Sequence, residues 1–449
     1  MCKYNTLLVF LIVAILVFAG CTNKVNPVKQ PAISLPASTI ASVDSSLTAS
    51  DSNIHVTDMN LSIAILGYYS CELAKYISVF VESNPDVNIT FIQYQHNHDE
   101  ECTEEMEFRE YEEFIRSTCQ KIASGEIQTD LIMYDSFYAK EFLDDGLLAD
   151  MSSNDVITGF FNNPNLLDGI KRLCVYDEKI IGIPLNIFYA GCIINKNLCN
   201  KIGITIPQNS WNQDDLFKMA TVLAEYNKTA ETKAYLFTSN GEVRPYANLR
   251  RGLYQNDSSQ PIFSSIEFID YMEKVKQIDD MGLTYVLDHF EQSGAAMLRD
   301  DVLLYEIAYS DLHNYEKSIF AEHTILPVQT VAGNPPYTNA SLLAISANPS
   351  NPALANAFIA GFLREEYQYI HAFEIQLYKD AEEYDILSTY SKATHEWIRT
   401  VTENSVPLYI SRDISAWIDT VELPQGTFNN INFKEWAARM QEEAVKLSE

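Results

Sequence analysis

The stretch from Ile180 to Trp211 constrains the fold of this 449-residue chain more than any other segment. It opens with a Gly-x-Pro turn and continues as a run of apolar, branched and aromatic residues, Leu185–Ile194, which predicts a strand. Segments with strand and helix periodicity alternate on both sides of it, as in α/β domains. We therefore expect a crossover strand between two lobes, with Phe188 and Tyr189 facing the cleft.

The N-terminus has the pattern of an export signal. Met1–Asn5 contains one Lys and no acidic residue, Leu7–Phe18 is an unbroken apolar run, and a small-small-Cys sequence ends at Cys21. The apolar run is too short to span a bilayer comfortably. This ending resembles the lipobox of bacterial lipoproteins, which implies removal of residues 1–20 and lipidation of Cys21 at the extracellular face of the cell membrane. An ordinary signal peptide with an incidental Cys is the alternative.

Composition excludes some functions for the remainder of the chain. Residues 21–60 are rich in Ser, Thr, Ala, Pro and Asn and predict a flexible tether. The formal net charge of −30 argues against nucleic acid as a partner, because phosphate binding requires clustered Lys and Arg. No Cys or His cluster has zinc spacing, so we expect neither a metal nor a cofactor. The six cysteines after Cys21 permit disulfides without establishing them.

Order is predicted to begin at Leu61 with a β-α-β-α-β-α succession, the pattern of a doubly wound sheet. The predicted strands here are 61–66, 87–94 and 130–134, and the helices are 71–83, 104–123 and 137–144. Further helices are predicted at 158–174, 211–226 (with Asn209 or Ser210 as N-cap), 244–254, 264–281, 351–373 and 433–447. Strands are predicted at 324–327 and 340–345, and 295–298 and 302–309 are extended or mixed.

Six short motifs occur in an order that resembles bacterial extracellular solute-binding proteins of the type 2 periplasmic-binding fold. They are Asn84-Pro85-x-Val87, Asp130–Asp135 with Phe142–Leu148, Gly182-Ile-Pro184, Asn195-Lys196-x-Leu198 with Pro207–Trp211, Gly294-Ala-Ala-Met297, and Leu343–Pro352. The resemblance implies an α/β fold of two lobes, each a sheet flanked by helices, joined by crossover strands. It also implies capture of a small molecule for an ABC permease. We expect lobe 1 to comprise 61–186 and 297–341, and lobe 2 to comprise 187–296 and 342–449.

A narrower resemblance is to thiaminase I, which is similar at Leu131–Leu148 and at Tyr309-Ser310-Asp311. That enzyme has a solute-binding fold and displaces the thiazole of thiamine with a Cys assisted by a Glu. The expected Cys position falls on Phe188 here, and Asp311 replaces the Glu. Cys192 lies four residues further, about 13 Å along an extended strand, so it would replace the nucleophile only in a shifted register. Cys192 and Asp311 are the alternative catalytic residues.

Candidate ligand-binding residues follow the ends of predicted strands, where two-lobed binders hold ligands. They are aromatic, acidic and amide side chains: Tyr68, Tyr69, Asp135, Tyr138, Phe188, Tyr189, Tyr309, Asp311, Tyr337 and Asn339. Such a set suits a flat cation of the thiamine type, and it also suits a sugar.

The sequence therefore leaves several hypotheses open. A lipid-anchored capture protein for an importer is favoured, since Phe188 offers a stacking surface where an enzyme would carry Cys. A thiaminase-like transferase, an inactive thiamine-binding relative, and a surface lipoprotein without a transport role are the alternatives.

Overall fold

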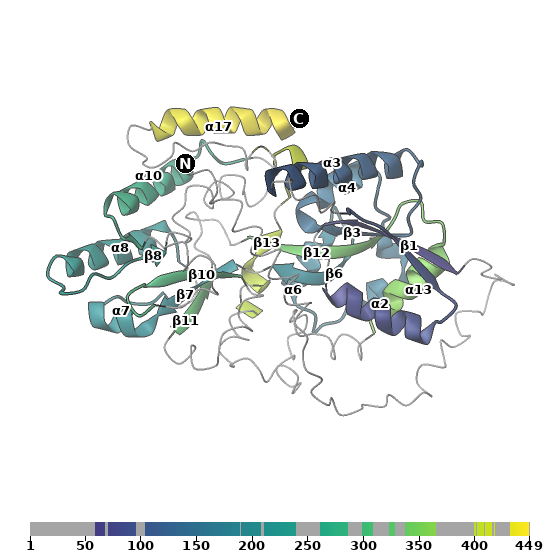
Figure 1. Ribbon diagram of the computed structural model, residues 1–449, viewed down its shortest axis with the longest axis horizontal. Coiled ribbons are helices and arrows are strands. Elements are labelled where there is room, and N and C mark those ends of the chain that lie inside the picture. Colours follow the sequence, from purple (N-terminus) through teal and green to yellow (C-terminus); the bar gives the residue numbers. More distant parts are fainter. Residues whose placement is uncertain are drawn as a thin grey trace, which may run out of the picture.

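The computed structural model describes residues 59–67, 71–95, 104–188, 190–207, 211–238, 261–285, 299–308, 323–327, 337–364, 399–400, 402–407, 409–414, 417 and 432–448. The described chain forms two lobes, each with its own sheet and its own buried cluster (Figure 1). The predicted α/β class with two lobes is confirmed.

The first sheet has the order β13-β12-β3-β1-β2, and β6 also pairs with β12. β1 is parallel to β2 and to β3, as expected of β-α-β units, whereas β12 is antiparallel to both β3 and β6. The strands are β1 (Asn60–Leu66), β2 (Asn88–Ile92), β3 (Leu131–Asp135), β6 (Ile183–Phe188), β12 (Tyr337–Ile345) and β13 (Val406–Pro407). All five residues of β3 are buried, which explains its continuous apolar sequence.

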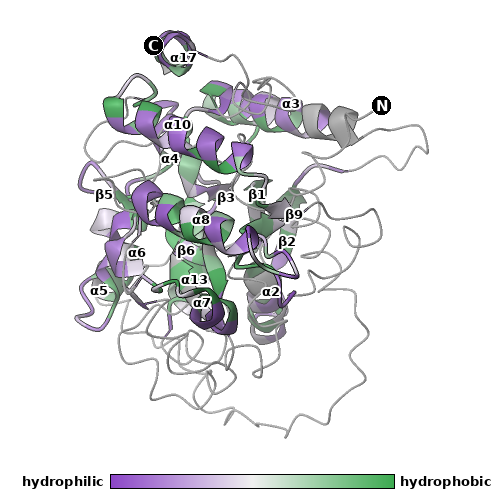
Figure 2. Ribbon diagram, turned by 90° about the vertical axis from the view of Figure 1, so that its left-hand side faces the viewer, coloured by the Kyte–Doolittle hydropathy of each residue, from purple (hydrophilic) through white to green (hydrophobic). Residues whose placement is uncertain are grey.

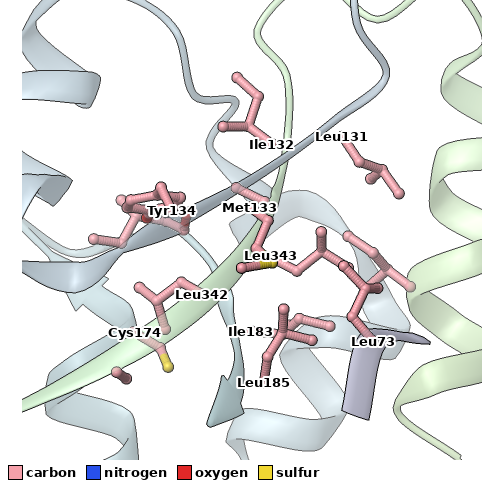
Figure 3. Packing of buried hydrophobic residues seen from close by; sticks show 14 of the residues in the cluster. Leu73, Leu131, Ile132, Met133, Tyr134, Cys174, Ile183, Leu185, Leu342 and Leu343 are labelled. Atoms are coloured by element: carbon pink, nitrogen blue, oxygen red, sulfur yellow. Dashed lines mark hydrogen bonds between the residues drawn. The ribbon is translucent and has the colours of Figure 1, made fainter. Parts of the chain in front are cut away.

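Helices cover both faces of the first sheet. Alternate residues of β12 point to opposite faces: Leu342 lies toward Cys174, and Leu343 lies toward Leu73 (Figure 3). The elements of this lobe are α2 (Cys71–Ser83), α3 (Glu104–Ala123), η2 (Ser136–Tyr138), α4 (Ala139–Asp144), η3 (Met151–Ser153), α5 (Asp155–Phe161), α6 (Asp168–Cys174) and α13 (Pro352–Phe362), with a small hairpin of β4 (Val175–Tyr176) and β5 (Lys179–Ile180). In Figure 2 the region of β6 and α13 is hydrophobic (green).

The second sheet is antiparallel, with the order β10-β7-β11. Its elements are β7 (Ala190–Asn195), α7 (Lys196–Ile202), α8 (Gln213–Asn227), β8 (Phe237–Thr238), α10 (Ile266–Asp280), β9 (Thr284–Tyr285), β10 (Leu304–Ala308), β11 (His323–Pro327) and α17 (Phe433–Ser448). Its buried cluster includes Trp211, Phe268 and Trp436, and the rings of the last two stack at 6.4 Å. α8 and α10 show mixed hydrophilic and hydrophobic surfaces, as amphipathic helices do (Figure 2).

The predicted crossover at Leu185–Ile194 is confirmed, but it consists of two strands. β6 ends at Phe188 in the first sheet and β7 begins at Ala190 in the second, so a single residue separates them. The hydrophobic periodicity of a sequence does not reveal the point at which the chain passes from one sheet to another.

The strand pairing differs from the predicted division of the C-terminal half. β10 and β11 belong to the second sheet, although 297–341 was expected in lobe 1. β12 and α13 belong to the first lobe, although 342–449 was expected in lobe 2. β12 forms its backbone hydrogen bonds with β3 on one side and with β6 on the other, and α13, which follows it, packs into the same core.

Three predicted helices have other limits. The helix at 158–174 is two helices, α5 and α6, separated at Asn162–Leu167, where Pro164 cannot continue the hydrogen-bond ladder. α8 has Asn212 as its N-cap in a capping box with Asp215, in place of Asn209 or Ser210. α13 ends at Phe362, well before residue 373. The predictions for 244–254 and 295–298 lie outside the described residues. Among the described residues, no helix is long and apolar enough to cross a membrane.

The described parts of a C-terminal segment, residues 402–407 and 409–414, contact both lobes. Arg172 of α6 donates to the carbonyl oxygens of Glu403 (2.6 Å) and Ser405 (3.1 Å) in the first lobe. Further along, Arg412 forms an ion pair with Glu141 of α4, with 2.6 Å between Nη2 and Oε1. Its neighbours Ile410 and Ile414 are buried in the cluster of the second lobe. The segment therefore connects α4 to the second lobe.

Replacing Glu141 by Ala is expected to lower the free energy of unfolding by about 3 kcal/mol, because it leaves the guanidinium of Arg412 buried without its main counter-charge. Chemical denaturation with global fitting measures this change. The control is Asp144→Ala on the same helix, where the exposed pair with Lys140 is worth no more than about 1 kcal/mol. Equal stability changes in the two variants would contradict the assignment.

Candidate functional site

Three strand ends meet at one edge of the first sheet. Because β12 runs antiparallel to its neighbours, its N-terminal half lies beside the C-terminal ends of β3 and β6. In the backbone register Ser341 is opposite both Asp135 and Asn186, and Asn339 is opposite Phe188. The structure therefore brings together three residues expected in the site from the sequence, Asp135, Phe188 and Asn339.

This edge faces the second lobe. β6 leads into β7 of the second sheet after one residue, and Phe137, just beyond β3, packs against the cluster of the second lobe. The carbonyl oxygen of Phe137 also accepts a hydrogen bond from the backbone N–H of Ile410 at 2.9 Å. A small molecule held at this edge would lie between the lobes, the arrangement that two-lobed binders use.

Asp135 is more buried than a ligand-binding carboxylate was expected to be. Only 5% of the residue is exposed, and its Oδ1 accepts a hydrogen bond from the hydroxyl of Ser341 at 3.3 Å. Ser341 itself is 1% exposed. The pair connects β3 to β12, and little of the carboxylate surface remains for a solute.

A compact network fixes the amide of Asn339. The hydroxyl of Ser136 donates to Asn339 Oδ1 at 2.6 Å, and the backbone N–H of Ala340 lies 2.8 Å from the same oxygen. The Ala340 N–H also lies 2.9 Å from Ser136 Oγ. Ser136 is fully buried, whereas Asn339 is half-buried. The network holds Ser136, the first residue after β3, against β12, and it leaves the Asn339 amide partly accessible to solvent.

The tyrosines expected in the site are only partly described. Tyr138 is half-buried, and its ring stacks on Phe142 at 6.3 Å, so it packs on α4. For Phe188 and Tyr337 the structure gives strand position, with Tyr337 opposite Val406. The remaining expected residues, Tyr68, Tyr69, Tyr189, Tyr309 and Asp311, lie outside the described residues.

Glycine is favoured at Gly67, just before Tyr68, by a close approach. A Cβ on this residue would lie 3.0 Å from the backbone nitrogen of Asp135. The chain leaving β1 therefore passes tightly against the end of β3.

Sequence reasoning missed three polar residues at this edge, Ser136, Asn186 and Ser341. Their signal is a polar residue inside an otherwise apolar strand or directly after one, as in the β6 sequence Ile-Pro-Leu-Asn-Ile-Phe. Such a residue sits on a pleated, largely buried surface, where a polar group requires a partner or solvent.

Cys192 is not placed for catalysis. Its side chain is fully buried in the cluster of the second lobe, and in register it lies between Glu306 and Leu326. A thiol without exposed surface cannot attack a dissolved substrate. Cys119, Cys174 and Cys199 are also buried, and none of these three is in a disulfide. Burial raises the pKa of Cys119 to about 11 and that of Cys199 to about 12, and it also raises the pKa of Cys174. Within the described part of the chain, no three His, Cys, Asp or Glu side chains are grouped to hold a metal ion.

No protein-family model matches the chain. Solved structures are similar over most of its length. An ABC substrate-binding protein of Listeria monocytogenes, solved with cycloalternan, has a TM-score of 0.57 and 14% identity, covering 86% of this chain and 98% of that one. The GacH receptor of Streptomyces glaucescens, solved unliganded and with acarbose, has a TM-score of 0.59, 14% identity and coverages of 86% and 98%.

A sugar transporter of Rhizobium etli in an open conformation has a TM-score of 0.60 and 13% identity, covering 86% of this chain and 99% of that one. Similarity at this level of identity establishes the architecture alone. The two-lobe periplasmic-binding-protein-like fold predicted from the sequence is therefore confirmed.

The four buried thiols are expected to resist alkylation in the folded protein. With iodoacetamide at pH 8, Cys119, Cys174, Cys192 and Cys199 should stay unmodified for hours, since the thiolate is the reactive species and burial excludes the reagent. Peptide mass spectrometry reads out each site, and the guanidinium-unfolded chain, in which all four react, is the control. Native modification of Cys192 at the unfolded rate would restore it as a candidate nucleophile.

Proposed function

We propose that the protein captures a small solute between its two lobes and delivers it to an ABC importer. The observation that carries the proposal is the edge at which the C-terminal ends of β3 and β6 lie beside the N-terminal half of β12 and face the second lobe. Ligands of open α/β sheets bind beyond the carboxyl ends of strands. The fold neighbours are substrate-binding proteins and transporter components, and their structures contain cycloalternan, acarbose, maltose or ribitol.

Of the two ligand classes that the sequence left open, a sugar or polyol is favoured over a flat cation. The described polar groups at the edge are hydroxyls and amides, and the one carboxylate among them, Asp135, is almost fully buried. An accessible carboxylate would favour a cation through a charge-assisted hydrogen bond. The transferase alternative lacks support at Cys192, whose thiol is buried.

The proposal includes a lipid anchor. The apolar run Leu7–Phe18 followed by a small-small-Cys sequence supports lipidation of Cys21, and the polar residues 22–60 provide a tether long enough for the lobes to meet a permease. The protein would then act at the outer face of the cell membrane.

Isothermal titration of the mature chain tests solute capture. We expect saturable, one-to-one binding of at least one neutral solute among linear and cyclic α-glucans, xylo-oligosaccharides and polyols, with thiamine weaker. Incubation with thiamine and aniline is the parallel assay for the transferase alternative, and no release of thiazole is expected. Absence of binding across the whole panel, or catalytic thiazole release, would overturn the proposal.

Cys21→Ser tests the anchor. The wild-type chain expressed in a bacterium is expected in the membrane fraction with the added mass of a diacylglyceryl group, because Cys21 Sγ is the acceptor. The variant should lose that mass and leave the membrane fraction. The matched control is Cys2→Ser, within the expected signal peptide, which should leave lipidation unchanged. Equal membrane retention of the two variants would contradict the anchor.

A further inference from the structure

The direction of the Asn339 amide follows from its neighbours. A backbone N–H can only donate, so the side-chain atom 2.8 Å from the Ala340 nitrogen must be the oxygen Oδ1. The same oxygen accepts the hydroxyl proton of Ser136 at 2.6 Å. Both lone pairs of Oδ1 are thereby used, and the NH₂ group is the end of the amide that remains.

The NH₂ group of Asn339 is open for a ligand. The side chain is half-buried, and among the described residues none accepts a hydrogen bond from Nδ2. A buried donor without a partner is costly, so such a group is tolerated where water or a ligand reaches it. Asn339 therefore presents two N–H donors at the edge where the strands end.

A second amide stands on the same face. Asn186 of β6 is half-buried and is opposite Ser341, two residues from Asn339 along β12. Residues two apart on a strand, and residues paired across strands, point to the same face. Diagonal neighbours of this kind lie roughly 7–8 Å apart, close enough for one small solute to contact both side chains.

We propose that Asn339 determines specificity in the solute site, donating from Nδ2 to a hydroxyl or carbonyl oxygen of a neutral solute, and that Ser136 is the positioning residue that fixes the direction of this donor. The inference rests on the proposed capture function and narrows its ligand class. A fixed N–H donor repels a cationic ring by its partial positive charge and pairs with the lone pairs of a polyol or sugar.

Asn339→Asp is the sharpest test. The substitution keeps the shape of the side chain and an oxygen facing Ala340 and Ser136, and it replaces the donor by an acceptor. By titration with maltotriose, xylobiose and ribitol, we expect roughly tenfold weaker binding of the tightest of the three. The solute oxygen that accepted from Nδ2 faces an acceptor in the variant, and a hydroxyl there must give up its own hydrogen bond elsewhere in order to donate to the carboxylate. Thiamine binding should stay unchanged or strengthen, since the variant supplies a carboxylate.

Two further variants separate positioning from folding. Asn339→Ala introduces no charge and should lower the affinity for the same neutral solute by a similar factor. It therefore tests the role of Asn339 even if the Asp variant does not fold. Ser136→Ala frees the Asn339 amide to rotate. This variant should lower the affinity for the neutral solute by less than the Asn339 variants do, and it should reduce the ratio of that affinity to the affinity for thiamine. Asn348→Asp makes the same change at an exposed residue just beyond the opposite end of β12 and should leave every affinity unchanged.

The outcomes distinguish the two claims. Neutral-solute affinities in Asn339→Asp and Asn339→Ala within twofold of wild type would overturn the role of Asn339 and leave solute capture standing. Binding of thiamine alone by the wild-type chain would likewise overturn the donor assignment while supporting capture. A wild-type chain that binds no member of the full panel of α-glucans, xylo-oligosaccharides, polyols and thiamine would overturn both.

Discussion

The pairing of β12 with β3 on one side and β6 on the other is the constraint on which the rest of the structure depends. Side chains alternate between faces along a strand, so a slip of one residue in this register would exchange the buried leucines for the polar residues. Both ends of β12 are held. Beyond its C-terminal end, the carboxylate of Asp130 accepts the backbone N–H groups of Ser62 (2.8 Å) and Asn351 (2.6 Å). At its N-terminal end, Ser136 and Ala340 form the network that fixes Asn339.

The same strand explains how two lobes are made from one chain. β6 crosses to the second sheet directly through β7, and β12 brings the chain back between β6 and β3. The C-terminal segment then leads to the second lobe again, with Arg412 placed against Glu141 and with Asp145 at 3.8 Å. Burial and the neighbouring Glu141 raise the pKa of Asp145. Glu141 lies on α4 and Asp145 is its C-cap, so the segment that leads to the second lobe is held against the helix that follows the site residues Asp135 and Ser136.

The sequence predicts what is local and leaves out what depends on distant pairing. β3 was predictable because a strand buried on both faces is continuously apolar, and Asp135 was expected because it ends that strand. The return of β12 to the first sheet was not, since antiparallel insertion between β3 and β6 joins segments about 150 to 200 residues apart. Ser136 and Asn186 were missed for a related reason. Their roles come from neighbours on another strand, and a single polar residue in an apolar run has no periodicity of its own.

The net charge of the chain suggests a cationic ligand, whereas the hydrogen-bonding groups at the site suggest a neutral one. The distance over which each effect acts decides between these two ligands. A formal charge of −30 attracts cations at a distance, but salt screens exposed charges within about 8–10 Å at physiological ionic strength. Selection between bound solutes is made by the groups in contact with them. At the described edge the carboxylate of Asp135 is buried against Ser341, and Asn339 is half-buried with its amide oxygen already occupied. The acidic surface therefore affects the solubility of the protein and its rate of encounter with charged molecules. The groups that contact the solute favour a neutral solute rich in oxygen acceptors.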